Sequence, residues 1–499
     1  MSRMAFEEEA DFVIVGTGAG GATAARVLTE AGHDVLLLEE GPRLQTDERP
    51  ERILDALHQA VRGFAGTATV GATPMPLLQG RCVGGSTAVN SGIIWRMPQD
   101  VQEDWTASHG LGELVEPRAQ ERIFQQLEDE LEVAETRPEV RGGNGHLMER
   151  ACTALGLPGK PIVRNAKRCR GAARCLQGCP GEARQSMDVS YIPRALAAGA
   201  RLHADARVQR VRIARGRAVG VEGDVVDRET RKPRGRFRVA ARRGVIVAAG
   251  AIHTPVILRR SGLKGLVGER FQAHPGAAVV GRFPEKVTMA QGATQSYEVP
   301  MRHQRFKIEG LSLPPEALAA RIPGAGAEWQ ERLTDLDCFA QWCVQARMRA
   351  HGRVRPGRDE PSVRYEPLAE DLAVIQRAIG LICRMMFAAG ATEVYPGLGR
   401  VPEILTDVSQ VDALERAPLR RGDFHLVASH LFGTACAGSD PSRSVVGPDL
   451  QSHEVPGLYV MDASVFPTNM GVNPQHSIMA VVWRAAEWLA EGKRVQVAA

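Results

Sequence analysis

Two glycine-rich segments, far apart in the chain, have the composition of loops that bind phosphate groups. The first is Gly16-Thr17-Gly18-Ala19-Gly20-Gly21, and the second is Gly80-Arg81-Cys82-Val83-Gly84-Gly85-Ser86. Glycine lets the backbone approach a pyrophosphate closely, and free N–H groups at the start of a helix favour its negative charge. Both segments serve one purpose if they meet around a single nucleotide, and we expect them to do so.

The elements around the first segment are those that such a loop needs. It follows the apolar, strand-like run 12–15 and precedes the helix-like run 22–31, and Glu39 closes a second strand over 35–38. This order is typical of a βαβ unit that binds a dinucleotide, in which the acidic residue accepts hydrogen bonds from a ribose diol. A glycine turn in an ordinary α/β protein is the alternative, and the intact context disfavours it.

Three cysteines form a separate pattern, Cys169-x5-Cys175-x3-Cys179-Pro180, with arginines on both sides. Thiolates are the usual ligands of iron–sulfur clusters, and arginines would offset their negative charge. Zinc would need a fourth ligand, and none is evident nearby. The pattern therefore indicates a possible iron–sulfur site. A loop with free thiols, or with a disulfide formed on purification, is an equal alternative.

The bulk properties exclude several functional classes. The chain has 499 residues, which is too long for a single compact core. Its net charge of +4 is too small for this length to indicate a nucleic-acid-binding surface. No apolar stretch is long enough to span a membrane. The acidic N-terminus runs directly into the first strand and does not resemble a secretory signal. We expect a cytoplasmic protein, whose export or membrane association would depend on a partner.

The remaining pattern is discontinuous. Short alternating runs over 207–247 predict antiparallel strands, and 244–250 is a buried strand ending in glycine. Apolar periodicity predicts helices over 370–389 and 477–490. Strands and helices thus alternate at both ends of the chain, which favours an α/β fold.

Four ordered blocks resemble the glucose–methanol–choline (GMC) oxidoreductase family over nearly the whole chain. They are VIVGTGAGGATAARVL, QGRCVGGSTAVNSGIIWR, GVIVAAGAIHTPVILRRSG, and SHLFGTACAG together with LYVMDASVFPTNMGVNPQHSIMAV. The resemblance implies a Rossmann-like FAD-binding domain with an inserted α+β substrate-binding domain on an antiparallel sheet. The FAD-binding domain would comprise 1–105, 190–282 and 426–499. A helical, cysteine-containing insertion would cover 106–189, and the substrate-binding domain 283–425.

The cofactor implied is FAD and not NAD, because one βαβ unit accounts only for the ADP half. The backbone of Val208 would pair with the adenine, and Asp462-Ala463 would contact the diphosphate and ribityl chain, although Asp462 could also be a simple cap. Val89 stands where some relatives carry a histidine bonded to FAD, so attachment should be non-covalent. The implied cofactor-binding residues are Gly16, Gly18, Gly21, Glu39, Arg81, Gly85, Ser86, Asn90, Val208, Ala249, Asp462, Ala463 and Asn473.

The resemblance also implies the chemistry, which is oxidation of an alcohol CH–OH group to a carbonyl with hydride transfer to flavin N5. The hydroxyl proton needs a base, and histidine suits that task near neutral pH. His430, in His-Leu-Phe-Gly-Thr, matches the catalytic histidine of the family. Asn473 matches its partner and could also cap the final helix. His476 is interpreted as structural or as a supporting residue, and His274 as structural or close to the cofactor.

The substrate class stays open at this point. Residues 301–314 and 338–342 resemble the branch that oxidises long-chain or otherwise apolar alcohols, and sugars are the alternative. The same fold also hosts lyases and a light-driven decarboxylase, so fold alone does not exclude them. A second rival is an electron-transfer subunit that passes electrons through the cysteine site to an acceptor protein. Reduction of the flavin by an alcohol in the dark separates these possibilities.

Overall fold

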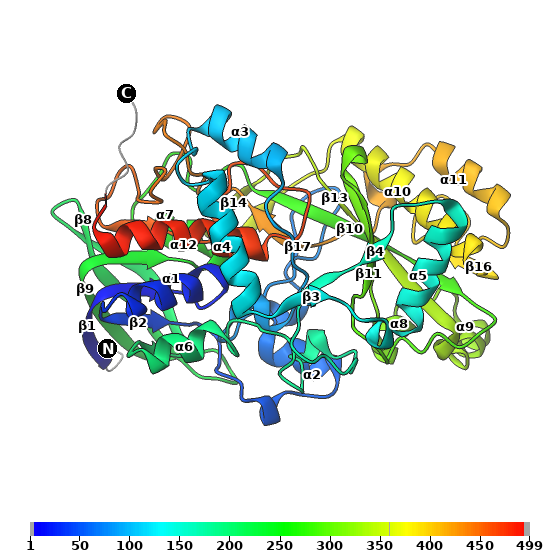
Figure 1. Ribbon diagram of the computed structural model, residues 1–499, viewed down its shortest axis with the longest axis horizontal. Coiled ribbons are helices and arrows are strands. Elements are labelled where there is room, and N and C mark those ends of the chain that lie inside the picture. Colours follow the sequence, from blue (N-terminus) through cyan, green and yellow to red (C-terminus); the bar gives the residue numbers. More distant parts are fainter. Residues whose placement is uncertain (1–3, 359, 494–499) are drawn as a thin grey trace.

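The computed structural model describes residues 4–358 and 360–493. The chain forms two seven-stranded sheets at opposite ends of an elongated molecule (Figure 1). The N-terminal elements and the C-terminal helix share one end, and the middle of the chain builds the other. This arrangement confirms the predicted α/β class. None of the described helices is long and apolar enough to cross a membrane.

The first sheet contains the predicted βαβ unit. Its order is β6-β2-β1-β9-β8-β7, with β18 also paired to β9. The contacts of β1 with β2 and β9, of β2 with β6 and of β9 with β18 are parallel, whereas β7, β8 and β9 pair antiparallel. The strands are β1 (Met4–Val15), β2 (Val35–Leu38), β6 (Arg201–His203), β7 (Ala206–Ala214), β8 (Arg217–Val226), β9 (Pro233–Val247) and β18 (Leu458–Val460).

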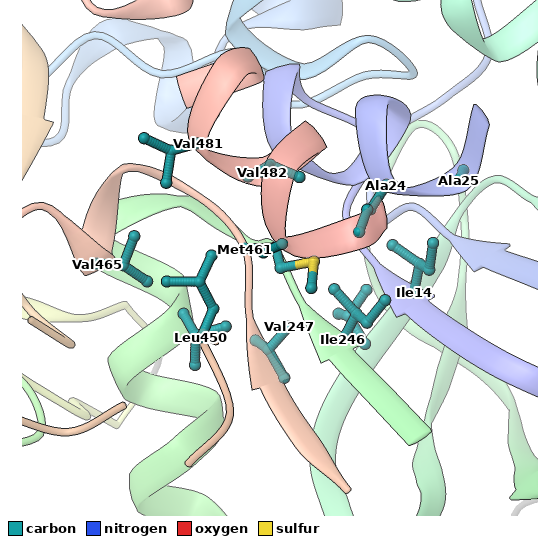
Figure 2. Packing of buried hydrophobic residues seen from close by; sticks show 14 of the residues in the cluster. Ile14, Ala24, Ala25, Ile246, Val247, Leu450, Met461, Val465, Val481 and Val482 are labelled. Atoms are coloured by element: carbon teal, nitrogen blue, oxygen red, sulfur yellow. The ribbon is translucent and has the colours of Figure 1, made fainter. Parts of the chain in front are cut away.

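Two helices from opposite ends of the sequence cover this sheet. They are α1 (Ala19–Glu30) and α12 (Gln475–Glu491), which pack against each other. Apolar side chains of β1, β9 and both helices meet in one core, as Figure 2 shows for Ile14, Ala24, Val247 and Val482. The N-terminal and C-terminal segments therefore share one hydrophobic core.

Glycines set the tight spacing at the start of α1. A Cβ at Gly21 would lie 2.0 Å from the carbonyl oxygen of Gly16, and one at Gly20 would lie 1.9 Å from that of Met461. Both positions lack room for a side chain, because backbone occupies that space. The first glycine loop is thus also a packing device that joins α1 to the ends of β1 and β18.

The second sheet is antiparallel throughout. Its order is β16-β10-β13-β12-β11-β4, with β17 paired to β10, and α10 (Ala369–Ala388) and α5 (Gly142–Leu155) pack against it. β10 belongs wholly to this sheet, so the sheet begins before the predicted boundary at 283. The strands are β4 (Lys160–Pro161), β10 (Gln272–Arg282), β11 (Tyr297–Met301), β12 (Phe306–Gly310), β13 (Phe339–Ala346), β16 (Glu393–Tyr395) and β17 (Val427–Phe432).

Shorter elements connect and flank the two sheets. The helices are α2 (Ile53–Ala60), α3 (Gln99–His109), α4 (Pro117–Glu130), α6 (Tyr191–Ala197), α7 (Gly250–Arg260), α8 (Pro315–Ala319), α9 (Gly326–Leu333) and α11 (Val411–Arg416). Two pairs of short strands are β3 (Val133–Glu135) with β5 (Val163–Asn165), and β14 (Arg353–Arg355) with β15 (Ser362–Arg364). The expected helices over 370–389 and 477–490 correspond to α10 and α12.

Candidate active site

A cavity of about 1010 Å³ lies between the two sheets. Its wall includes the ends of β1 and β9 from the first sheet, and residues of β10, β13 and β17 from the second. A volume of this size is at the upper end of the range for small-molecule sites, about 300–1,000 Å³. The cavity is therefore placed and sized to hold a large ligand that spans both sheets.

The two glycine loops meet at this cavity, as their sequences predicted. The N–H group of Gly84 donates to Thr17 Oγ1 at 3.0 Å, and a Cβ built on Gly85 would lie 2.9 Å from the Cα of Gly18. Gly18 begins the first turn of α1, and a Cβ there would have nothing within 4 Å. Its backbone is therefore open to the cavity beside the N-terminus of a helix, where an anionic group binds favourably.

Glu39 lies in the cavity wall, and protein donors fix its orientation. Thr17 donates through its hydroxyl at 2.7 Å and its N–H group at 3.1 Å, and Gly41 donates its N–H group at 2.9 Å. Burial raises the pKa of Glu39 although these donors act in the opposite direction. A carboxylate oxygen can accept two hydrogen bonds, and among the described residues Oε1 accepts only the one from Gly41, so Glu39 retains capacity for a ribose hydroxyl.

Asp462 and Asn90 also line the cavity, and their side chains form hydrogen bonds with other groups of the protein. Asp462 accepts from the N–H groups of Gly250 at 2.9 Å and Ser464 at 2.7 Å, and from the Thr254 hydroxyl at 2.5 Å. Asn90 donates to Gln475 Oε1 at 2.8 Å and accepts from the N–H group of Gly92. Both side chains thus hold the loops around the cavity. Asp462 caps the short helix that follows it, which was the alternative interpretation of this residue.

The structure separates the predicted cofactor residues into two groups. Gly21 and Arg81 are not among the described residues that line the cavity; Gly21 packs against the backbone instead, and the backbone of Arg81 lies against Gly41. All the other predicted residues do line it: Gly16, Gly18, Glu39, Gly85, Ser86, Asn90, Val208, Ala249, Asp462, Ala463 and Asn473.

His430 lies on β17 at the cavity, directly opposite His274 on β10. The Nδ1 atoms of the two rings are 3.4 Å apart, and the ring planes are nearly perpendicular. Burial, with a smaller effect of the Lys307 charge, lowers the pKa of His430 to about 3. Burial also lowers the pKa of His274 well below its usual range, and the neighbouring His430 adds to this. Both imidazoles are therefore neutral near pH 7, as a proton acceptor must be.

His274 also contacts the loop that precedes Asn473. Its Nε2 atom lies 3.2 Å from Asn469 Oδ1 and 3.0 Å from the backbone nitrogen of Gly471. His274 itself lines the cavity beside His430, and its predicted structural or cofactor-proximal role stays a prediction. The register of β10 with β17 places the two rings together.

Asn473 lines the same cavity but does not cap the final helix. Pro474 occupies the cap position of α12, and the carbonyl oxygen of the Asn473 side chain accepts a hydrogen bond from Lys307 Nζ. Lys307 is fully buried on β12 and also forms ion pairs with Glu298 and Glu309. Sequence reasoning missed this charged cluster. Its only signal was a lysine and a glutamate two positions apart in an otherwise apolar strand.

His476 is not a cavity residue. It lies on α12 with no exposed surface, stacks on Phe124, and neither ring nitrogen has a hydrogen-bond partner among the described residues. Burial lowers the pKa of His476 to about 3, and the Arg96 charge acts in the same direction. His476 is therefore a packed core residue.

His476→Phe should make the protein more stable in acid relative to wild type. Below pH 6.5 the unfolded chain binds a proton at this histidine, whereas the folded chain does so only near pH 3. The wild type therefore loses stability through His476 as the pH falls below 6.5, and the variant does not. Between pH 7.5 and 5.5 the difference in unfolding free energy should change by about 1.4 kcal/mol in favour of the variant. Urea denaturation at both pH values checks this, and a pH-independent difference would contradict it.

The structure gives no support to the predicted iron–sulfur site at Cys169, Cys175 and Cys179, which stays a prediction. Among residues 4–358 and 360–493, no group of three or more His, Cys, Asp or Glu side chains could hold a metal ion. Cys175 accepts from the Arg164 guanidinium at 3.1 Å and Cys169 from the same group at 3.9 Å, whereas Cys179 accepts from the backbone of Arg184. All three are free thiols in a segment that packs beside the cavity, so we assign no cluster to it.

Comparison with known proteins identifies the family. The models of the N- and C-terminal domains of GMC oxidoreductases match residues 10–276 and 346–481. The chain belongs to the GMC oxidoreductase family. A GMC-type oxidoreductase of Mycobacterium tuberculosis described as uncharacterized is 38% identical over 486 residues, 96% of this chain and 75% of the relative.

More distant relatives of this GMC oxidoreductase carry named activities. A long-chain-alcohol oxidase of Arabidopsis thaliana is 25% identical over 95% of this chain and 68% of its own length. The crystal structure of pyridoxine 4-oxidase from Mesorbium loti superposes with a TM-score of 0.70 at 16% identity, covering 97% of this chain and 99% of that one. The fold is therefore the GMC fold, with an FAD-binding domain.

The cavity fits FAD as the family implies. The Gly18 backbone is open to it, Glu39 is oriented at the end of β2, and Asp462 ties the start of α7 to the loop after β18. Val89, which also lines the cavity, carries no group that could bond covalently to the cofactor. Gly18, Glu39 and Asp462 follow strands of the first sheet, whereas His430 lies on β17 of the second sheet.

Proposed function

We propose that this GMC oxidoreductase binds FAD non-covalently and oxidises the CH–OH group of an apolar alcohol to a carbonyl. The observation that supports this is one cavity lined by the dinucleotide loop, by His430 and by Asn473. FAD, when bound, supplies the acceptor for the hydride that leaves the alcohol carbon. The remaining chemistry is the removal of the hydroxyl proton, and it belongs to the protein.

His430 accepts that proton at a ring nitrogen. It is neutral near pH 7 because burial disfavours the imidazolium form, and it faces the cavity from β17. A positioned base of this kind contributes about 10²- to 10⁴-fold to the rate of proton transfer. Asn473 hydrogen-bonds to the substrate oxygen and orients it toward His430. The transfer balances, since the alcohol loses one proton to His430 and one hydride from carbon.

The substrate preference rests on the wall that the second sheet provides. Apolar residues line this part of the cavity, among them Leu311, Leu313, Val344 and Leu431. A named relative acts on long-chain alcohols, which agrees with an apolar chain lying against this wall. Glutamine side chains are also present, so a polar group on the substrate could be accommodated beside the reacting carbon.

The purified protein should be yellow, and a medium-chain primary alcohol should bleach its flavin absorption in the dark without oxygen. Acid precipitation should leave the flavin in the supernatant, because valine at position 89 has no group that could bond covalently to it. A panel of alcohols and sugars, followed by stopped-flow absorbance, identifies the substrate class. Bleaching only by sugars would overturn the apolar preference. Bound flavin that no alcohol or sugar reduces would favour a lyase or decarboxylase.

A further inference from the structure

Lys307 has a chemically unusual environment for a lysine. It has no exposed surface, and its ammonium group contacts Glu298 Oε2 at 3.0 Å, Glu309 Oε1 and Asn473 Oδ1. An ammonium group has three N–H donors and no acceptor. Glu298 and Asn473 accept hydrogen bonds from this group, and Glu309 forms an ion pair with it.

The strand register brings these charges together. Glu298 on β11 lies directly opposite Glu309 on β12, and Lys307 is two residues before Glu309. Residues two apart in a strand lie on the same face of the sheet. Two carboxylates that face each other in the interior would repel strongly, and Lys307 between them offsets that repulsion.

Other donors complete the cluster. Trp95 Nε1 donates to Glu298 at 3.2 Å, Lys160 Nζ lies 3.6 Å from Glu298, and Gln295 donates to Glu309 at 2.9 Å. Burial lowers the pKa of Lys307, but the charges of Glu298 and Glu309 outweigh it and leave the pKa raised. Lys307 is thus a fixed cation in a buried network.

This cation determines which end of the Asn473 amide faces the cavity. Because an ammonium only donates, the atom of Asn473 that contacts it must be the carbonyl oxygen. The NH₂ group is then directed away from Lys307, and no hydrogen bond between described residues uses it. Asn473 lines the cavity, whereas Lys307 is not among the described lining residues. The orientation of Asn473 is therefore fixed from behind by a residue that does not reach the substrate.

We propose that Lys307 is a positioning residue that makes Asn473 a hydrogen-bond donor to the substrate oxygen. The donor would stabilise the negative charge that develops on this oxygen as its proton moves to His430. The proposal rests on the proposed function for its substrate. It goes further by assigning the direction of the Asn473 hydrogen bond to a residue of the second sheet.

The test compares Lys307→Met, Asn473→Ala and the double variant. Asn473→Ala should slow flavin reduction by an alcohol by about 10²-fold, the usual effect of removing one such donor. Lys307→Met should slow it by about 10- to 100-fold. In the Asn473→Ala background, Lys307→Met should change the rate by less than about threefold, because burial keeps His430 neutral at pH 7 without the Lys307 charge and the remaining effect passes through Asn473. Independent, multiplicative effects, or no effect of Lys307→Met, would overturn the proposal.

A second pair of variants serves as a control for loss of folding. Lys307→Met leaves two buried carboxylates without their cation, so Lys307→Met/Glu309→Gln removes one of the negative charges. Lys307→Gln keeps an N–H donor for Asn473 and should restore part of the reduction rate. FAD content and melting temperature identify variants that fold. A well-folded Lys307→Gln no faster than Lys307→Met would count against the hydrogen bond.

Binding of octanoate gives a readout without turnover. Its carboxylate stands in for the negatively charged substrate oxygen, and the change in the flavin's visible absorption reports binding. Lys307→Met and Asn473→Ala should each weaken octanoate binding by about tenfold, with no further loss in the double variant. If the wild type fails to oxidise any alcohol, the proposed function fails, and this measurement still decides the role of Lys307. Unchanged octanoate affinity in Lys307→Met would overturn it.

Discussion

His430→Ala should leave FAD bound and slow its reduction by an alcohol about 10²- to 10⁴-fold. The side chain lies at the cavity on β17, and burial with the nearby Lys307 charge keeps its pKa near 3. It is therefore a neutral acceptor at any pH above about 4, and the loss should be similar across that range. Anaerobic stopped-flow reduction at saturating alcohol measures the effect directly.

His476→Phe is the matched control for this experiment. His476 is also a buried histidine with a pKa lowered to about 3, yet it packs on α12 and does not line the cavity. Its replacement should leave the reduction rate within about threefold of wild type. A fast His430→Ala variant together with a slow His476→Phe variant would show that the base is assigned to the wrong histidine.

Gly18→Val should abolish flavin retention without unfolding the protein. Gly18 has an ordinary extended backbone with φ −69°, and a Cβ there meets nothing within 4 Å because it enters the cavity. The side chain would occupy the space where a phosphate approaches the backbone at the start of α1. If this steric conflict costs more than about 1.4 kcal/mol of binding free energy, FAD binds more than tenfold more weakly. Flavin content per chain after gel filtration gives the result.

Gly422→Val provides the comparison. A Cβ at Gly422 also meets nothing within 4 Å, its backbone needs no left-handed conformation, and the residue is exposed away from the cavity. That variant should keep its flavin. Gly20→Val is expected to behave differently from both, since its Cβ would collide with the carbonyl oxygen of Met461 and prevent folding. If Gly18→Val retained its full flavin content, the cofactor would have to bind at a place other than the start of α1.

The sequence was sufficient to predict which glycines and which acidic residue line one half of the cavity. The constraint there acts on the backbone, so it selects glycine at fixed positions and leaves a pattern that can be recognised. Gly16, Gly18 and Gly85 lie where the two loops meet, and Glu39 lies at the end of β2. Gly21 was placed in the right motif, but its role is packing against Gly16.

The substrate half could not be predicted in the same way. Lys307 and Glu309 are visible as charges in an apolar strand, but the partner Glu298 becomes apparent only from the register of β11 with β12. The cysteines differ in that their spacing predicts a site that the structure does not support. Their spacing fits a cluster, yet Cys179 has a left-handed backbone with φ 57° and contacts a backbone amide, while Cys169 and Cys175 share one arginine. Spacing alone does not determine the path of a loop.

The placement of β17 and β18 has a consequence for how the chain is made. β18 pairs with β9 in the first sheet, and β17 carries His430 and pairs with β10 in the second. α12, the last described helix, then packs on α1 near the start of the chain. During synthesis neither sheet can be completed until the strands after residue 426 have left the ribosome. Until then each sheet lacks one strand, and the cavity that both sheets line is complete only after β17 and β18 have been synthesised.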